Sequence, residues 1–223
     1  MANLLYRSIS GGSSTSSGTV DVTAPSGVAN LDLEVLYVVT YVVTASAVTH
    51  TTPSGWTFIR SDTQSVLGGA YEKRTSLYWK YAGASEGTTT ISFSGSTASA
   101  AGEIYCADNP LGASAYDTNT YNTGSGTAIS GSTLTTFEAN EMILGFASTD
   151  GGGSASTFTT SDLTERDDQN SVTVGEVFQA SQGASGAKSW TASLSGSWSA
   201  YLVSFRSEAA GGGSSTSLAW IKA

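Results

Sequence analysis

The chain has 223 residues, of which 12% are charged and 39% hydrophobic, so its composition fits neither charge-rich disorder nor a coiled coil. Nine basic and 18 acidic residues give a net charge of −9, and the basic residues are scattered, which argues against duplex nucleic acid as a partner. Serine, threonine and glycine contribute 38, 30 and 26 residues, which leaves little room for long helices.

Cysteine and histidine usage limits how the fold can be held together. Cys106 is the single cysteine and His50 the single histidine, so no intrachain disulfide or structural zinc site is expected. The first residues lack the pattern of a secretory signal, and the most apolar run, residues 31–47, is too short and too rich in Val, Tyr and Thr for a spanning helix. We therefore predict a soluble protein made in a cytoplasm, with no membrane partner.

Short segments of alternating apolar and polar residues, bounded by Gly, Ser, Asn and Pro, predict β-strands along the chain. The predicted strands cover residues 3–9, 19–23, 33–44, 56–62, 74–81, 88–93, 102–106, 133–137, 142–149, 172–180, 188–194 and 200–206. Because each segment can bury one face, the pattern predicts an all-β, antiparallel β-sandwich, jelly-roll-like and with almost no helix. No internal repeat with a period of 20–50 residues is found. The aromatic residues expected in the core are Tyr37, Trp56, Phe58, Trp79, Phe93, Trp190 and Phe205.

The segment Gly83-Ala84-Ser85-Glu86-Gly87 matches the G-x-S-x-G motif of serine hydrolases. In those enzymes the motif joins a strand to a helix, and a histidine base is required. Here strand-like residues lie on both sides, and His50 is the only imidazole. We predict an ordinary hairpin turn, no catalytic residues and no enzymatic activity.

Two other groups with chemical potential are expected to be structural. No Lys or Arg lies near Cys106 in the sequence, so we predict a buried thiol and not a reactive one. The acidic side chains in residues 161–170 could offer oxygen ligands to calcium, but their spacing matches no known calcium loop, so we predict a solvated acidic loop, no metal and no cofactor. These side chains are Asp162, Glu165, Asp167 and Asp168.

The segment from residue 108 to 131 has no sustained periodicity and is longer than an ordinary connection. We predict a surface loop, and loops of this kind often carry function. Tyr116 and Tyr121 in this segment could stack on sugars, or they could pack on the surface of the domain itself.

The composition changes after Arg206. We divide the chain into a sandwich domain over residues 1–206 and a tail over residues 207–223, in which a Gly/Ser-rich linker precedes the apolar residues Leu218, Trp220 and Ile221. These three side chains are predicted to dock onto a partner. The alternative is that the tail folds back on its own sandwich.

Three stretches carry a resemblance to a known family: PSGWTFIRSDTQ, LYWKYAGASEGTTTISFSGSTASAAGEIYCADNP and ASGAKSWTASLSGSWSAYLVSFRS. They resemble β-sandwich domains of tailed-phage virion proteins and of some bacterial surface proteins, and the resemblance covers roughly residues 3–206. Where that family usually has a small aliphatic strand and a Gly-Val-Asp turn, this chain has IYCADNP.

The resemblance implies a structural protein of a phage virion, assembled in the host cytoplasm. We expect a capsid decoration or cement protein that binds the major capsid protein or another virion protein, as a homo-oligomer and by analogy a trimer. The alternative is a tail-associated receptor- or carbohydrate-binding module whose partner is a host glycan. A glycan hydrolase is the least favoured class, because no particular carboxylate pair stands out.

Overall fold

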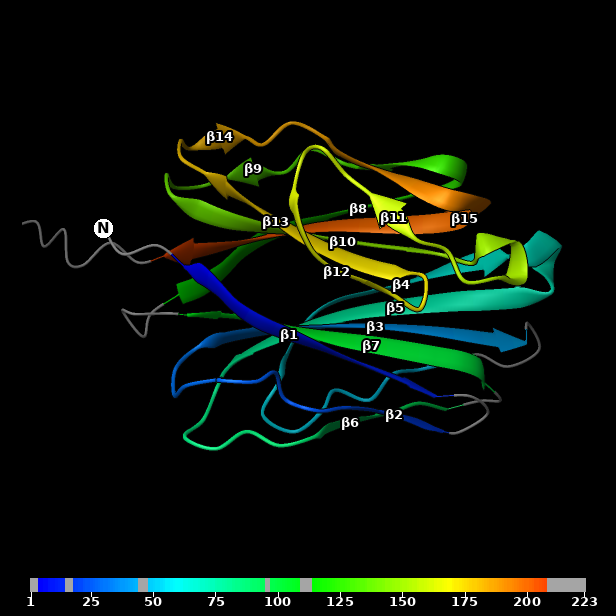
Figure 1. Ribbon diagram of the computed structural model, residues 1–223, viewed down its shortest axis with the longest axis horizontal. Coiled ribbons are helices and arrows are strands. Elements are labelled where there is room, and N and C mark those ends of the chain that lie inside the picture. Colours follow the sequence, from blue (N-terminus) through cyan, green and yellow to red (C-terminus); the bar gives the residue numbers. More distant parts are fainter. Residues whose placement is uncertain (1–3, 15–17, 44–47, 95–96, 109–113, 208–223) are drawn as a thin grey trace, which may run out of the picture.

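The computed structural model describes residues 4–14, 18–43, 48–94, 97–108 and 114–207. These residues form fifteen β-strands and two short 3-10 helices, and no α-helix occurs among them. Every strand pair is antiparallel. The predicted all-β antiparallel sandwich is confirmed (Figure 1).

The first half of the chain forms one sheet with the strand order β1-β7-β3-β5-β4. A separate ribbon, in which β2 pairs with β6, lies beside this sheet (Figure 1). The strands are β1 (Leu5–Ser14), β2 (Thr19–Val22), β3 (Leu33–Val43), β4 (Thr57–Val66), β5 (Tyr71–Tyr81), β6 (Thr89–Ser92) and β7 (Thr97–Asp108), with the 3-10 helix η1 (Leu67–Gly69) between β4 and β5.

The second half forms the other sheet, with the order β8-β15-β10-β13-β12 and the short β11 also paired with β15. Here β9 pairs with β14 in a separate ribbon. The strands are β8 (Ser114–Gly131), β9 (Thr135–Thr136), β10 (Glu141–Thr149), β11 (Phe158–Thr159), β12 (Thr164–Gln169), β13 (Val172–Gln179), β14 (Gly183–Ala184) and β15 (Lys188–Ser207), and the 3-10 helix η2 (Gly151–Gly153) follows β10.

The two halves repeat one arrangement of seven strands. Strands β8, β9, β10, β12, β13, β14 and β15 pair with one another just as β1 to β7 do, and β11 is the one strand added. One short sequence match accompanies the repeat, since Ser-x-Ser-Gly-Ser occurs at residues 92–96 and 193–197. In a jelly roll the strands alternate between the two sheets. Here each half divides its strands between two layers in this way, into the sheet β1-β7-β3-β5-β4 and the ribbon β2-β6 in the first half and into β8-β15-β10-β13-β12 and β9-β14 in the second, so the order is jelly-roll-like within each half.

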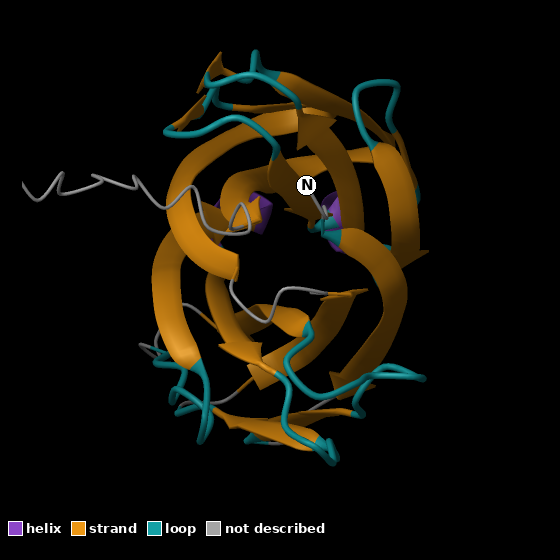
Figure 2. Cartoon of the chain, turned by 90° about the vertical axis from the view of Figure 1, so that its left-hand side faces the viewer, coloured by secondary structure: helices purple, strands orange, loops and turns teal. Residues whose placement is uncertain are grey.

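The molecule has four layers, and three apolar clusters lie between them (Figure 1). The inner cluster lies between the two sheets and takes residues from both halves. One outer cluster joins the first sheet to its β2–β6 ribbon, and the other covers the outer face of the second sheet. Viewed end-on, the two sheets curve around the shared interior (Figure 2).

Strands β3 and β10 are the central strands of their sheets, and both of their faces are covered. This explains their nearly continuous apolar sequences, LEVLYVVTYVV and EMILGFAST, because a strand buried on both faces cannot alternate with polar residues. All nine residues of β10 are buried, and so are nine of the eleven in β3.

Hydrogen bonds join the two halves across the inner cluster. The Tyr37 hydroxyl lies 2.9 Å from Ser148 Oγ, and the Tyr41 hydroxyl donates to the Thr149 carbonyl at 2.9 Å. The Tyr201 hydroxyl bonds Thr75 Oγ1 and donates to Asp62 Oδ2 at 3.1 Å. Because buried polar groups destabilise a fold unless they are paired, these bonds favour one relative placement of the two sheets.

Several sequence expectations are corrected by the structure. The predicted loop over residues 108–131 is wrong, because residues 114–131 form β8, which pairs along β15. The predicted acidic loop is also wrong in part, since Thr164–Gln169 is the edge strand β12, where charged side chains hinder pairing with other chains. Phe58 is 52% exposed and Trp79 only half-buried, so neither is a core residue of the kind expected.

No helix in the described parts of the chain has the length and apolar character needed to cross a membrane.

Candidate functional site

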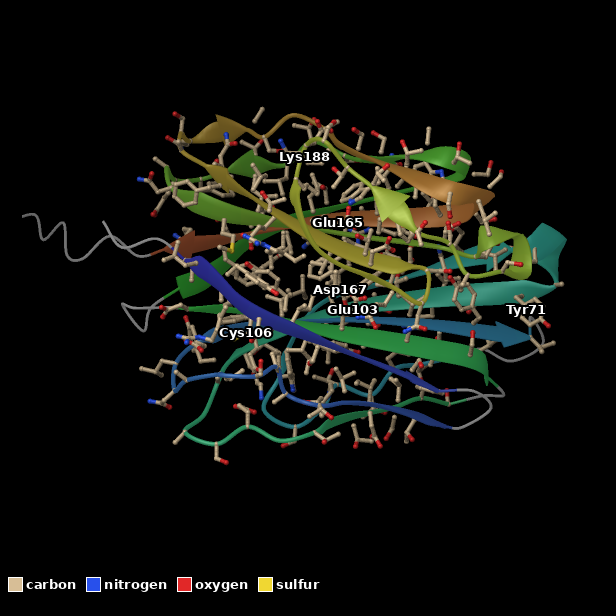
Figure 3. All side chains as sticks on the ribbon, in the orientation of Figure 1. Tyr71, Glu103, Cys106, Glu165, Asp167 and Lys188 are labelled. Atoms are coloured by element: carbon tan, nitrogen blue, oxygen red, sulfur yellow. The ribbon has the colours of Figure 1, made fainter. Side chains whose placement is uncertain are left out.

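A cleft of 420 Å³ opens between the two halves at the end of the sandwich that carries the β4–β5 turn. We call it the interhalf cleft. The first half contributes Tyr41, Leu67 and Tyr71, and the second contributes Asp150 and Asn170. Tyr71, the first residue of β5, is labelled at this end of the molecule in Figure 3. Clefts between structural units are common ligand sites.

Asp150 lies at the wall of the interhalf cleft and is 8% exposed. It caps the helix η2, whose three glycines adopt positive φ angles. Its Oδ1 accepts hydrogen bonds from the Gly152 amide at 3.0 Å and from the Ser197 amide at 2.9 Å. The side chain is therefore held in one orientation.

Two tyrosines provide the aromatic surface of the cleft. The Tyr41 hydroxyl is occupied by the Thr149 carbonyl, and burial raises the pKa of this phenol well above its usual value. Tyr71 is half-buried, as Tyr41 is, and follows the η1 turn, where Leu67 has a φ of 50°. Across the cleft, Asn170 and Ser171 form the β12–β13 turn with φ angles of 52° and 63°.

The opposite end of the molecule carries most of the exposed large apolar side chains among the described residues. Six of the eight large apolar side chains that are exposed among the described residues lie at this end, where β1 begins and β15 ends (Figure 1). We call it the apolar end. The six are Leu5, Leu31, Phe58, Tyr81, Phe137 and Phe178, with exposed fractions between 37% and 64%. Exposed apolar surface of this kind marks interaction sites.

A groove of 680 Å³ runs along the apolar end. Its apolar lining includes Leu5, Met142 and Phe178, from both halves. Arg166 also lines it, with its guanidinium 4.2 Å from the centre of the Tyr6 ring and 2.5 Å from Glu176. The groove therefore combines an apolar floor with one ion pair.

Tyr116 and Tyr121 lie on strand β8, which pairs with β15, and not in a surface loop. Their neighbours on the strand are mostly Ser, Thr and Asn, so the sequence reads as polar although it is paired. Both rings pack against the inner cluster. The Tyr121 ring centre is 4.7 Å from that of Tyr201, and the Tyr116 ring meets Phe205 edge-on at 6.2 Å. Burial raises the pKa of Tyr121 to about 12. Two alternatives were open for these rings from the sequence, stacking on sugars and packing on the domain itself. In the structure both rings pack on the domain itself.

His50 and Ser85 do not form a hydrolase pair in this structure. The His50 ring nitrogens bond Thr40 Oγ1 at 2.9 Å and Ser76 Oγ at 2.8 Å, and burial together with nearby Arg74 lowers its pKa to about 3. Ser85 lies in the turn between β5 and β6, and Glu86 in that turn accepts from the Gly83 amide. The predicted hairpin is wrong, because β6 pairs with β2.

Three of the four acidic side chains in residues 162–168 accept local hydrogen bonds. Asp162 accepts from the Ser189 amide and hydroxyl, and Asp168 accepts from the Phe158 amide at 2.8 Å. Asp167 accepts from the Gln169 side chain, and Glu165 is exposed on β12. Within the described ranges, no three His, Cys, Asp or Glu side chains are arranged to hold a metal ion.

Cys106 is fully buried, as predicted. Its thiol lies 3.7 Å from Asp32 Oδ2, and burial raises its pKa well above the usual value, so the reactive thiolate is disfavoured. The predicted docking residues Leu218, Trp220 and Ile221 lie outside the described residues.

The residues of the interhalf cleft were not identified from the sequence. Tyr41, Tyr71 and Asp150 are far apart in the chain, and only the packing of the two sheets brings them together. A local signal existed at Asp150, since an aspartate followed by three glycines indicates a capped tight turn.

A comparison with models of known protein families finds no match, and no curated protein sequence matches the chain.

Proposed function

We propose that this chain is a non-catalytic structural protein of a phage virion, and specifically a capsid decoration or cement protein that binds the major capsid protein. The observation that carries the proposal is the apolar end, together with the chain's resemblance to virion β-sandwich domains. In the proposal, the apolar end faces the capsid and the protein assembles as a trimer.

The end of β15 supports the apolar end as the attachment surface. Strand β15 ends at Ser207 close to the groove, because Phe205 pairs with Met142 in the groove lining. Ten residues separate Ser207 from Leu218, and an extended chain of that length spans about 35 Å, enough to reach a neighbouring subunit. Tail and groove can therefore act on the same partner.

The polar contacts of the titratable groups support a non-catalytic role. A general base must reach the proton that it abstracts, and a nucleophilic serine needs such a base beside it. Both ring nitrogens of His50 are bound to hydroxyls of neighbouring strands, and Ser85 lies in a different turn. The proposal therefore assigns the chain a binding role.

Copy number and docking test this proposal. On a stained gel of purified virions, a decoration protein is expected at a copy number comparable with that of the major capsid protein. Phe137→Ser and Leu5→Ser should weaken binding of the purified protein to undecorated capsids, whereas Val43→Ser, at a residue that is also exposed but lies at the other end, should not. A few to tens of copies per virion, or equal binding by all three variants, would contradict the proposal.

The second candidate is a tail-associated receptor- or carbohydrate-binding module, and the interhalf cleft is the observation that favours it. The low copy number that contradicts decoration is the result expected for this candidate.

A truncation tests whether the tail attaches the protein to its partner in the decoration proposal. A chain ending at Ala210 should melt at the same temperature as the full-length protein and no longer join capsids or oligomers. Loss of folding, or unchanged binding, would show that the tail is not an attachment arm.

A further inference from the structure

We infer that the interhalf cleft binds a neutral saccharide, with the Tyr71 ring against the apolar face of the sugar and with Asp150 and Asn170 bonding its hydroxyls. The inference deepens the second candidate function by naming its ligand class and site. It does not depend on decoration, because the cleft lies at the opposite end of the sandwich from the apolar end.

The size and placement of the cleft suit a small ligand. Its volume of 420 Å³ lies in the lower part of the range of small-molecule sites, which is about 300–1,000 Å³. A pocket of this size has room for one or two sugar rings and not for a folded partner. Because both halves contribute walls, a ligand in the cleft contacts both sheets at once.

The charge of the lining excludes most anionic ligands. No Lys, Arg or His is among the described residues that line the cleft, and Asp150 is the one charged side chain there. The chain as a whole carries a net charge of −9. An anionic ligand such as a phosphate or an acidic sugar would therefore meet repulsion from Asp150 with no cation in the lining, since the nearby Lys73 is buried behind it and donates to backbone carbonyls.

The remaining lining matches the two surfaces of a sugar. The C–H face of a pyranose ring is apolar and packs on aromatic rings, while its edge carries hydroxyls that both donate and accept hydrogen bonds. Tyr41 and Tyr71 supply aromatic rings, and Tyr41 is fixed through Thr149. Hydroxyl and amide groups surround them, from Ser13, Ser99, Ser154, Ser171, Thr149 and Asn170.

Asp150 supplies a fixed acceptor for these sugar hydroxyls. Among the described residues, both hydrogen bonds to its carboxylate go to Oδ1, so Oδ2 is the oxygen left for a ligand. A carboxylate held by two backbone amides keeps its orientation before the ligand arrives, which lowers the entropic cost of binding.

The rim of the cleft is also preorganised. It is formed by tight turns, in which Leu67, Asn170 and Ser171 hold left-handed backbone conformations that only firmly closed turns maintain. These turns belong to the equivalent hairpins of the two halves, β4–β5 and β12–β13. The repeat of the strand arrangement thus places two equivalent turns on the rim of one cleft.

Ligand-observed NMR on the full-length protein tests the inference with defined probes. The neutral probes are the methyl glycosides of glucose, galactose, N-acetylglucosamine and N-acetylgalactosamine, and the charged probes are glucuronate and N-acetylneuraminate. At least one neutral glycoside should show saturation transfer at millimolar concentration, with little transfer to the charged sugars. Absence of transfer to every neutral probe, or equal transfer to charged ones, would overturn the inference.

Matched variants locate the site. Tyr71→Ala should weaken binding of the responding glycoside about tenfold or more, while Tyr71→Phe keeps it, because the ring and not the hydroxyl makes the contact. Tyr81→Ala, at the other end of the same strand β5, should bind as the unaltered protein does. Asp150→Asn should weaken binding and leave the fold intact, since the amide oxygen still accepts from the Gly152 and Ser197 amides. Unchanged binding by Tyr71→Ala, or an equal loss in Tyr81→Ala, would overturn the assignment.

The two proposals fail separately. A high-copy protein on the virion gel with no sugar binding would leave decoration standing and remove the saccharide site. Sugar binding by a low-copy protein would leave the saccharide site standing and remove decoration.

Discussion

In the first half of the chain, the two-stranded β2–β6 ribbon covers the outer face of the sheet. In the second half, tryptophan side chains cover the outer face of the other sheet. The β2–β6 ribbon has four residue pairs, and Val20, Val22 and Ile91 from it enter the outer cluster. The equivalent β9–β14 ribbon has only two pairs. In the second half, Trp190 and Trp198 from β15 fill the outer cluster instead.

Glycines make both solutions possible. A Cβ atom at Gly102 would lie 2.8 Å from a methyl carbon of Val22, so the ribbon can approach the first sheet only because that position lacks a side chain. In the second sheet, a Cβ at Gly145 would lie 2.7 Å from the Trp190 ring, and one at Gly124 would lie 2.3 Å from Trp198. The same strand order therefore tolerates two different coverings if glycine provides the space.

The inner faces of the two sheets differ in charge. The first half turns Lys73 and Glu103 into the interior, where they are 1% and 2% exposed. The second half meets Lys73 with the backbone carbonyls of Ser148 and Ser197 and lies near Glu103 with Asp167 and Asp168, while most of its inner face is apolar, with residues such as Phe146 and Val174. The charged side chains buried between the sheets thus come mainly from the first half, and their burial is unfavourable. The second half contributes mainly apolar side chains to the same interior.

The largest expected effect comes from the tryptophan covering. Trp190→Ala should lower the free energy of unfolding by about 3–5 kcal/mol, because a large cavity opens in a cluster where this ring is 2% exposed. The half-buried Trp79 should cost less when replaced by Ala. Urea unfolding followed by circular dichroism measures both. A second transition in Trp190→Ala, with one half unfolding before the other, would show that the inner cluster does not make the halves one cooperative unit.

The glycine positions offer a smaller and more specific test. Gly102→Ala and Gly145→Ala should each destabilise by about 1–3 kcal/mol, since the added methyl overlaps Val22 in one half and Leu163 and Trp190 in the other. Gly87→Ala is the control, because a Cβ there meets nothing within 4 Å. Thermal unfolding of the three variants measures the difference, and a Gly102→Ala protein as stable as Gly87→Ala would contradict the close approach of the ribbon.

Much of this fold could be predicted from the sequence, and the limits have physical causes. Alternation located most strands, but β8 was missed because its sequence is polar and its place depends on pairing with β15, more than 50 residues away. Strand β6 was predicted correctly, but it was expected to pair with β5 in a hairpin and it pairs with β2. Alternation of apolar and polar residues does not indicate which strands pair with each other. The cleft residues could not be grouped, because their meeting depends on how two sheets stack.

The buried lysine provides a test by pH. Burial lowers the pKa of Lys73 to about 7, whereas an unfolded chain has a lysine pKa of about 10.4. Between these values the unfolded state binds more protons, so stability should rise with pH from about 7 to about 10, by at most about 1.4 kcal/mol per pH unit. Lys73→Met should remove this rise, and Lys188→Met, at the half-buried start of β15, should not. Denaturant unfolding at several pH values measures the slopes, and equal slopes in the two variants would contradict the assignment.

The smallest expected effect concerns Glu103, whose pH dependence has the opposite sign. Burial, with Asp167 and Asp168 nearby on β12, raises its pKa well above the usual value, and neither carboxyl oxygen has a hydrogen-bond partner among the described residues. The stability from the neutral form is complete below the unfolded pKa of about 4.3 and is lost as the pH rises toward the folded pKa. Glu103→Gln should match the unaltered protein near pH 4 and become the more stable of the two near pH 7. The gain is modest because the amide keeps buried polar atoms unpaired. Melting temperatures measured across this range decide the matter: a stability difference that does not change with pH would mean that the pKa of Glu103 is not raised, and the inner face of the first half would then bury an ionised carboxylate near neutral pH.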